Sequence, residues 1–306
     1  MKSAVLAGPE QIIIEEYARP KSPSGEVLIE VAYVGICGSD QEQYWAQTDQ
    51  VPKPMVFGHE FSGRLASVHP SVPGLKIGQP VTVAPLLNCE SCNYCLSERE
   101  NLCQKRRRFG SDVAGALQEF VSIPAKRVFP LPENLSMKEG ALVEPLAVAY
   151  HAVRLANFEG QGNIVVVGAG AIGLLIAQIC QALGKSRVYV VDIDAARLSI
   201  ANELGISAWD PDPGDSHISI MFEASGSASA FSTWASALAP RGQAVIVGKL
   251  TENANLDWVN LLRREASIIT SRYFTLHDFQ QSLSLLHNRQ VNLRPLIGRE
   301  VSFESL

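Results

Sequence analysis

A short apolar run, a glycine-rich turn and a second apolar run follow one another in residues 163–184, NIVVVGAGAIGLLIAQICQALG. The first run is β-branched, which predicts a strand, and the second spaces its apolar residues as an amphipathic helix does. A strand that passes through a tight turn directly into a helix is typical of a parallel sheet. The chain around this segment must therefore supply further strands to the same sheet.

Strand and helix patterns alternate after this segment, which predicts an α/β domain with a doubly wound parallel sheet at 151–265. We expect its strands within 187–194, 218–226 and 243–250, and its helices within 194–205 and 227–240. Residues 1–150 instead contain short β-branched runs broken by turn residues, which predict a β-rich domain with long loops.

The glycine turn spells G-x-G-x-x-G at Gly168, Gly170 and Gly173, and Asp192 follows nineteen residues later at the end of the next expected strand. In this context the motif indicates a dinucleotide site, with the phosphates at the helix N-terminus. Asp192 can bind ribose hydroxyls and repels a 2′-phosphate, so NAD is expected rather than NADP. The alternative is a glycine turn with a structural role alone.

Composition excludes several classes of protein. The chain has 306 residues and a net charge of −5, and its one basic run, Lys105–Arg108, is too short to indicate a nucleic-acid surface. We interpret that run as a solvated patch. No apolar run approaches the roughly 20 residues of a membrane span, and the N-terminus lacks a signal-peptide pattern. We expect a cytoplasmic protein with a small-molecule substrate, and no nucleic-acid or membrane partner.

Four of the six cysteines, Cys89, Cys92, Cys95 and Cys103, lie within fifteen residues. In a reducing compartment such a cluster indicates a metal site rather than disulfides. Four thiolates without an open position favour a structural zinc ion. The alternatives are an iron–sulfur cluster or four unrelated buried thiols.

Further candidate metal ligands are Cys37 in GICGSD, His59 and Glu60 in FGHEFSG, and Glu144 in VEPLAVAYHA. Each of these residues alone is more often structural than functional. Together with the four-cysteine segment, VVGAGAIGLLIAQ and FEASG, they stand in an order that resembles the zinc-dependent medium-chain dehydrogenase/reductase family, in its polyol dehydrogenase branch.

The resemblance implies a GroES-like β-rich catalytic domain at 1–150 and a Rossmann NAD-binding domain at 151–265, with the active site between them. It implies that 266–306 returns to the catalytic domain in shortened form. A homodimer or homotetramer is also implied. A catalytic zinc would be held by Cys37 and His59, and either Glu60 or Glu144 would complete the protein ligands.

The implied reaction is NAD-linked oxidation of a secondary hydroxyl on a polyol, a sugar alcohol or its phosphate. Zinc acts as a Lewis acid on that hydroxyl, an alkoxide forms, and hydride passes to the nicotinamide. Ser39 would carry the proton outward. Glu42 stands where many members of the family have a histidine, which leaves the rest of the proton path open.

The resemblance also assigns cofactor contacts to Ile172, Arg197, Val247 and Gly248, and places Arg272 and Tyr273 on the wall of the polyol pocket. For Arg272 the alternative is a surface salt bridge. A phosphorylated substrate would need a cationic partner, for which Arg272 and the Lys105–Arg108 run are the candidates. Two other classes of function remain as alternatives: a non-enzymatic NAD-responsive regulatory protein, and a zinc-free quinone reductase relative. The second would have no use for Cys37, His59 or the four-cysteine segment.

Overall fold

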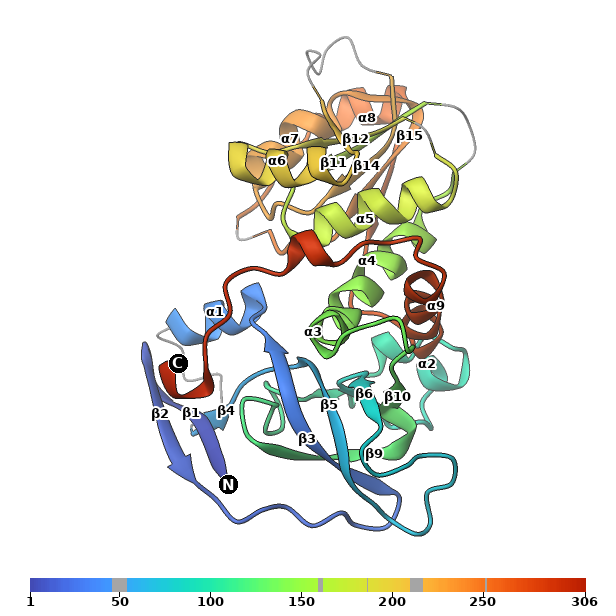
Figure 1. Cartoon of the computed structure of the whole chain (residues 1–306). Helices are drawn as coiled ribbons and strands as arrows, with labels where there is room; N and C mark the ends of the chain where they lie inside the picture. Colours follow the sequence, from blue (N-terminus) through green and yellow to red (C-terminus); the bar gives the residue numbers. More distant parts are fainter. Residues whose placement is uncertain (46–53, 159–161, 186, 210–216, 251) are drawn as a thin grey trace. The chain divides into compact units, whose positions relative to one another are not determined.

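The computed structural model describes residues 1–45, 54–158, 162–185, 187–209, 217–250 and 252–306. They form two compact units, Met1–Glu144 with Ile297–Leu306, and Pro145–Leu296 (Figure 1). The expected return segment is divided, because 266–296 lies in the second unit and 297–306 in the first. Among the described residues, no helix has both the length and the apolar character needed to cross a bilayer.

The second unit contains the predicted parallel sheet. Its strands run in the spatial order β13, β12, β11, β14, β15, β16, and every neighbouring pair is parallel. Numbered along the chain within this sheet, the order is 3-2-1-4-5-6, which is that of a dinucleotide-binding Rossmann fold. The strands are β11 (Asn163–Val167), β12 (Val188–Val191), β13 (Ser207–Ala208), β14 (Ile218–Glu223), β15 (Leu238–Ile246) and β16 (Ser267–Thr270).

Helices flank this sheet (Figure 1), and most begin at a side chain that caps free backbone N–H groups. The caps include Asp194 before α6 and Ser227 before α7. The expected strands and helices of this region are present, but β15 begins at Leu238, inside the segment expected to be helical, and the short strands β13 and β16 were not expected. The helices are α4 (Val143–Leu155), α5 (Ala171–Ala182), α6 (Ala195–Glu203), α7 (Ala228–Ala235), α8 (Trp258–Arg263) and α9 (Leu276–His287), followed by a short 3-10 turn η4 (Arg294–Leu296).

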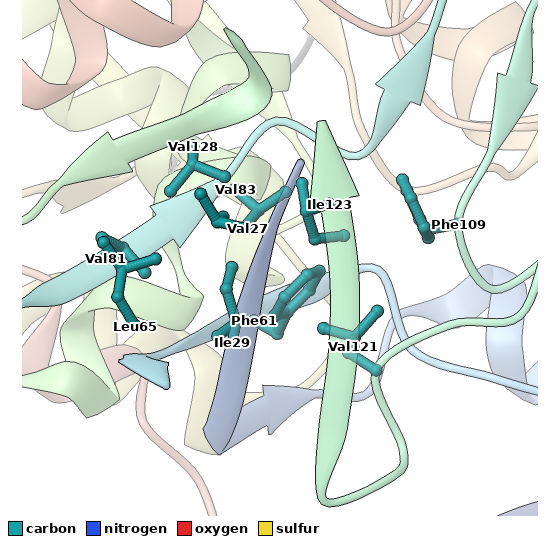
Figure 2. Close-up of a cluster of buried hydrophobic side chains, with 11 residues drawn as sticks. Val27, Ile29, Phe61, Leu65, Val81, Val83, Phe109, Val121, Ile123 and Val128 are labelled. Atoms are coloured by element: carbon teal, nitrogen blue, oxygen red, sulfur yellow. The ribbon is translucent and has the colours of Figure 1, made fainter. Parts of the chain in front are cut away.

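A five-stranded antiparallel sheet forms the centre of the first unit, in the order β10, β6, β5, β3, β9. One cluster of buried apolar side chains, which includes Ile29, Phe61 and Ile123, packs within it (Figure 2). Burial of such side chains is the main stabilising contribution in a fold of this kind. The strands are β3 (Glu26–Gly35), β5 (Glu60–Val68), β6 (Pro80–Val83), β9 (Phe120–Pro124) and β10 (Val128–Pro130).

Two smaller sheets complete the first unit: β2-β1-β4 and β7-β8. Phe303, near the C-terminus, packs against the apolar cluster of the first of these, and Lys2 forms an ion pair of 3.4 Å with Glu304. The remaining elements are β1 (Lys2–Gly8), β2 (Gln11–Glu16), β4 (Met55–Val56), β7 (Leu86–Leu87), β8 (Arg107–Arg108), α1 (Gly38–Trp45), α2 (Asn93–Leu96), α3 (Met137–Ala141), η1 (Glu100–Leu102), η2 (Ala125–Arg127) and η5 (Phe303–Ser305).

A buried carboxylate joins two helices of the second unit. Asp278, in α9, accepts hydrogen bonds from Thr275 N at 2.8 Å and Arg154 Nε at 2.7 Å, and its Oδ2 lies 2.8 Å from His151 Nδ1. Burial alone would raise the pKa of Asp278, but the contacts with His151, Arg154 and Thr275 outweigh burial and hold the pKa below its ordinary value of 3.8. The ionised carboxylate therefore stabilises the packing of α4 and α9.

We expect Asp278→Asn to lower the free energy of unfolding by about 2–4 kcal/mol near neutral pH, because it leaves buried donors without their charged acceptor. The pKa is depressed in the folded state, so this stabilisation is present above about pH 4 and is lost as the pH falls further. The difference between wild type and variant, measured by denaturant unfolding, should therefore shrink on acidification. Glu203→Gln, at an exposed position of the same unit, is the control.

Candidate functional site

Three expected metal ligands meet where two paired strands of the first unit begin and end. Gly35, the last residue of β3, pairs with Glu60, the first residue of β5. Cys37 lies two residues beyond β3, and His59 immediately precedes β5. One ligand atom from each of Cys37, His59 and Glu60 lies within 4.8 Å of the others. The pairing of two strands thus gathers a thiol, an imidazole and a carboxyl group.

Gly35 provides the space that the Glu60 side chain occupies. A Cβ atom built on Gly35 would lie 2.5 Å from Glu60 Oε2 and 3.2 Å from Glu60 Cβ. Any larger residue at position 35 would therefore displace the carboxylate. Gly35, the first residue of the GICGSD segment, therefore has a steric role: its lack of a side chain leaves room for the carboxylate of Glu60.

Asp40, which is buried, contacts both Cys37 and His59 and orients them. Its Oδ2 accepts a hydrogen bond of 3.0 Å from Cys37 N, as the third residue of a helix often does for the residue before the helix. Its Oδ1 lies 3.4 Å from His59 Nδ1. A carboxylate at this nitrogen is the usual partner of a metal-binding histidine, and it leaves Nε2 for the ion.

The site concentrates acidic groups away from water. Burial, followed by the charge of Glu144, raises the pKa of Glu60 to about 8. Burial also raises the pKa of Glu144. Burial alone would lower the pKa of His59, but its contacts with Asp40 and Cys37 outweigh burial and raise that pKa to about 11. The raised pKa values of both glutamates show that burial makes their ionisation unfavourable, a cost that a bound cation would offset.

A divalent cation fits this set of residues. One ligand atom from each of the three residues lies within 4.8 Å of the others, which is close enough for all three to share one ion. A thiolate, an imidazole and a carboxylate form a donor set that suits zinc and leaves a fourth position for another ligand. Such an open position distinguishes a catalytic zinc site from a structural one.

Glu144, in the first turn of α4, lies beside this set rather than within it. Its charge acts on both His59 and Glu60. The group of ligand atoms within 4.8 Å of one another contains Glu60 and does not contain Glu144. Of the two glutamates left open by the sequence, Glu60 has the geometry of a ligand, and Glu144 that of a neighbouring buried carboxyl group.

Ser39, the second residue of α1, is half-buried, whereas Glu42 is exposed. The Ser39 hydroxyl accepts a hydrogen bond of 3.4 Å from Arg108 Nη1. Arg108 is the last residue of the basic run that we interpreted as a solvated patch. That interpretation is wrong for Arg108, which is half-buried and contacts the site, whereas Lys105 and Arg107 are exposed.

The four cysteines of the second expected metal site converge in the first unit. Their sulfur atoms lie within 4.8 Å of one another, and none of the six cysteines forms a disulfide. The distance between Sγ atoms is 3.5 Å for Cys92 and Cys95, 3.5 Å for Cys89 and Cys103, and 3.9 Å for Cys89 and Cys95. Four sulfurs at 2.3 Å from a tetrahedral zinc would be about 3.8 Å apart, so the spacing fits that ion.

The acidities of these thiols also favour a cation. Backbone N–H groups of Ser91 and Cys92 lower the pKa of Cys89 to about 6, which favours its thiolate. Burial and contacts with Cys92 and Cys103 raise the pKa of Cys95 to about 12. Crowded thiols of this kind ionise together only when a metal ion offsets their charges.

The expected dinucleotide site has the backbone geometry that the motif requires. Gly168 has φ of +102°, and a Cβ atom there would lie 2.7 Å from Ser225 N. A Cβ atom on Gly173 would overlap the Gly168 carbonyl oxygen, whereas one on Gly170 would meet no atom within 4 Å. The open space at Gly170, directly before the N-terminus of α5, is where a pyrophosphate needs close approach.

Asp192 lies just beyond β12 and beside the glycine turn. Its Oδ2 accepts a hydrogen bond of 2.7 Å from Ala169 N, its Oδ1 accepts one of 2.9 Å from Asp194 N, and Arg197 Nη1 is 3.5 Å from Oδ2. Although burial opposes ionisation, these donors lower the pKa of Asp192. The carboxylate is therefore held ionised next to the turn.

The remaining expected cofactor contacts flank the same end of the sheet. Ile172 is the second residue of α5 and is half-buried. Val247 and Gly248 follow β15, and their N–H groups each donate a hydrogen bond of 2.9 Å to Glu223 O. Glu223 Oε1 also accepts from Ser225 N and Gly226 N, each at 2.8 Å. Glu223 thus fixes two loops at the carboxyl ends of the strands, where such sheets bind ligands.

Arg272 and Tyr273 follow β16 in the second unit. The Arg272 guanidinium carbon lies 4.9 Å from the centre of the Tyr273 ring, and Tyr273 has φ of +55°. A non-glycine residue in this left-handed conformation is uncommon and is often found at functional positions. Their role in a substrate pocket stays a prediction.

Three residues that contribute to these sites were not among those expected from the sequence. Asp40 and Glu223 lie within segments that drew attention, CGSD and FEASG, and their burial is the signal that only the structure supplies. Arg108 gave no signal of its own, because the sequence does not distinguish it from the three other basic residues of the run.

Comparisons with known proteins agree with this geometry. Residues 23–133 match the family described as alcohol dehydrogenase GroES-like domain, and residues 171–288 match zinc-binding dehydrogenase. The chain is 32% identical to 2-dehydro-3-deoxy-L-galactonate 5-dehydrogenase of Pseudoalteromonas atlantica, over 90% of this chain and 84% of that protein. It is also 32% identical to probable D-xylulose reductase A of Aspergillus clavatus, over 99% and 90% of the two chains.

A solved structure has the same fold. Galactitol-1-phosphate dehydrogenase of Escherichia coli superposes with a TM-score of 0.91 at 29% identity, over 100% of this chain and 94% of that chain. The fold class predicted from the sequence, a GroES-like domain with a Rossmann domain, is therefore confirmed.

We expect purified protein to contain about two zinc ions per chain. Cys92→Ser should remove about one of them and lower the melting temperature by about 5–10 °C, because the four-thiolate site no longer closes. Elemental analysis and thermal unfolding measure the two effects. Cys180→Ala, which removes a buried thiol in α5, should keep both ions. Full stability of Cys92→Ser without the second ion would contradict a structural role.

Proposed function

This chain belongs to the zinc-dependent medium-chain dehydrogenases, and from that premise we propose that it oxidises a secondary hydroxyl of a polyol, sugar alcohol or related sugar derivative to a ketone, with NAD as hydride acceptor. The observation that carries the proposal is the cluster of half-buried Cys37 with buried His59 and Glu60, beside Glu144. A carboxylate in place of a second thiolate makes the metal site harder, which suits a hydroxyl-rich substrate.

In this proposal Cys37, His59 and Glu60 hold the catalytic zinc, which when bound polarises a substrate oxygen and lowers the pKa of the reacting hydroxyl. Asp40 keeps His59 oriented through its 3.4 Å contact with Nδ1. Glu144 supplies a second carboxyl group beside the ligands, and burial raises the pKa of that group. The four cysteines of the lobe hold a structural zinc and take no part in the reaction.

Ser39 receives the proton of the reacting hydroxyl in this scheme. Its hydroxyl group can donate and accept at once, as a relay requires. Glu42, one turn later on α1, is exposed to solvent and is the proposed next acceptor in place of the usual histidine. Arg272 and Tyr273 are the proposed polar wall for the substrate's other hydroxyl groups.

We also propose NAD rather than NADP, a cytoplasmic location and a homodimer or homotetramer. Asp192 supports the first, because its ionised carboxylate repels a 2′-phosphate. Six free cysteines support a reducing compartment. The similar proteins are named for a galactonate, for xylulose and for galactitol 1-phosphate, so the substrate class includes sugar acids and phosphates as well as uncharged polyols.

Asp192→Ala should reduce the preference for NAD over NADP by about 10–100-fold, because it removes both a ribose acceptor and the repulsion of the 2′-phosphate. The measurement is kcat/KM for each cofactor at saturating polyol. Glu203→Gln, at the far end of α6, is the control and should keep the wild-type ratio. Tighter binding of NADP than of NAD by the wild type would refute the assignment.

The substrate class is tested by NADH formation with matched pairs, sorbitol against its phosphate and galactitol against galactitol 1-phosphate. We expect at least one of these to exceed ethanol in kcat/KM, and Glu144→Ala to lower that value by about 100-fold or more. Glu133→Ala, at an exposed position, controls for the loss of a carboxylate. Faster turnover of ethanol than of every polyol would refute the branch, and undiminished activity of Glu144→Ala would remove Glu144 from the site.

A further inference from the structure

Arg108 is held at a fixed position beside the proposed catalytic site. It belongs to the short strand β8, where it pairs with Leu86 of β7, and its N–H donates a hydrogen bond of 2.8 Å to Asp112 Oδ2. Its side chain is half-buried, whereas that of Arg107 is exposed. The contacts of the Arg108 backbone with Leu86 and Asp112 fix this part of β8, so that Arg108 is half-buried while the adjacent Arg107 is exposed.

The guanidinium of Arg108 is oriented by hydroxyl groups. Nε donates to Ser111 Oγ at 3.0 Å, and Nη2 donates to the same oxygen. Ser111 Oγ also accepts a hydrogen bond of 3.3 Å from Gln43 Nε2. These hydrogen bonds fix the orientation of the planar guanidinium group.

The remaining amino group, Nη1, points toward the reacting end of the site. It donates a long hydrogen bond of 3.4 Å to Ser39 Oγ, the proposed proton acceptor. The charge of Arg108 also acts on Glu144 and favours its ionised form. Arg108 is therefore close enough to contact a molecule whose hydroxyl reaches Ser39.

We propose that Arg108 is a specificity-determining residue that binds an anionic group of the substrate, either the carboxylate of a sugar acid or the phosphate of a sugar-alcohol phosphate. The proposal rests on the proposed dehydrogenase function and narrows its substrate class to acidic polyols. A planar guanidinium in fixed orientation matches the paired oxygens of both groups. Partial burial strengthens such a contact relative to one at the exposed surface.

The alternative role for Arg108 is to offset the carboxylates of the site itself. That role requires positive charge alone, and it would make Arg108 equally important for charged and uncharged substrates. Substrate recognition instead makes its importance depend on the charge of the substrate. The two roles are therefore separated by one ratio, kcat/KM for an anionic substrate divided by kcat/KM for its uncharged counterpart.

The experiment compares galactitol, galactitol 1-phosphate and galactonate, and the corresponding sorbitol series, with wild type, Arg108→Gln and Arg108→Lys. We expect the wild type to prefer an anionic member, and Arg108→Gln to lower the anionic-to-neutral ratio by about 10–100-fold, mainly through KM. Arg108→Lys keeps the charge without the planar fork and should lie between the two. Comparison of phosphate with carboxylate identifies which anion is used.

Arg107→Gln is the matched control, since it removes the same charge from the adjacent exposed position and should leave the ratio unchanged. Added salt should weaken the preference of the wild type for the anionic substrate more than it affects the uncharged one. Zinc content and circular dichroism establish that each variant is folded and loaded. If Arg108→Gln is misfolded, Arg108→Lys decides the question.

Equilibrium binding gives a readout that is independent of turnover. Enzyme loaded with NADH, which cannot accept hydride, is titrated with galactitol 1-phosphate or galactonate by calorimetry, and Arg108→Gln should bind about 10–100-fold more weakly. Equal losses for charged and uncharged substrates, or a wild type that prefers the uncharged polyol, would overturn the proposal. Absence of turnover with every substrate would instead reject the proposed function. The binding data would still show whether Arg108 binds the anionic group.

Discussion

Crowded acidic groups are the constraint that organises the first unit. The carboxyl group of Glu60 lies close to the thiol of Cys37, with the buried carboxyl group of Glu144 beside them, and like charges in such a place are costly unless a cation offsets them. The same physics recurs in the four-cysteine lobe, where neighbouring thiols have acidities displaced in opposite directions. Much of the surrounding structure, from the space at Gly35 to the hydrogen bonds of Asp40, keeps these groups together.

The sequence allowed the architecture of the second unit to be predicted closely, because its signals are local. Apolar strands, capped helices and the glycine turn are each complete within about twenty residues, and their alternation predicts a parallel sheet. The four-cysteine site was predictable for the same reason. What the sequence did not indicate in this unit was the network of Asp278 with His151 and Arg154, since its members are more than 120 residues apart.

The proposed catalytic site was only partly predictable, because its main features are distances between separate segments. Sequence and family resemblance pointed to Cys37 and His59 and left two glutamates open. The strand pairing of Gly35 with Glu60 distinguishes them, and a pairing register is a tertiary property. Arg108 was misjudged for a related reason. A run of four basic residues predicts a solvated surface, but the β7–β8 pairing turns one of the four toward Ser39.

The position of the ligands along the chain has a consequence for biosynthesis. Cys37, His59 and Glu60 span 24 residues at the ends of two directly paired strands, and the lobe cysteines span fifteen. Both sets precede the Rossmann unit in the sequence. Since chains emerge from the ribosome N-terminus first, the proposed ligands of both ions are synthesised before the nucleotide-binding unit, whereas residues 297–306, which complete the first unit, are synthesised after it. All the proposed metal ligands of the first unit are therefore present before the fold of that unit can be completed.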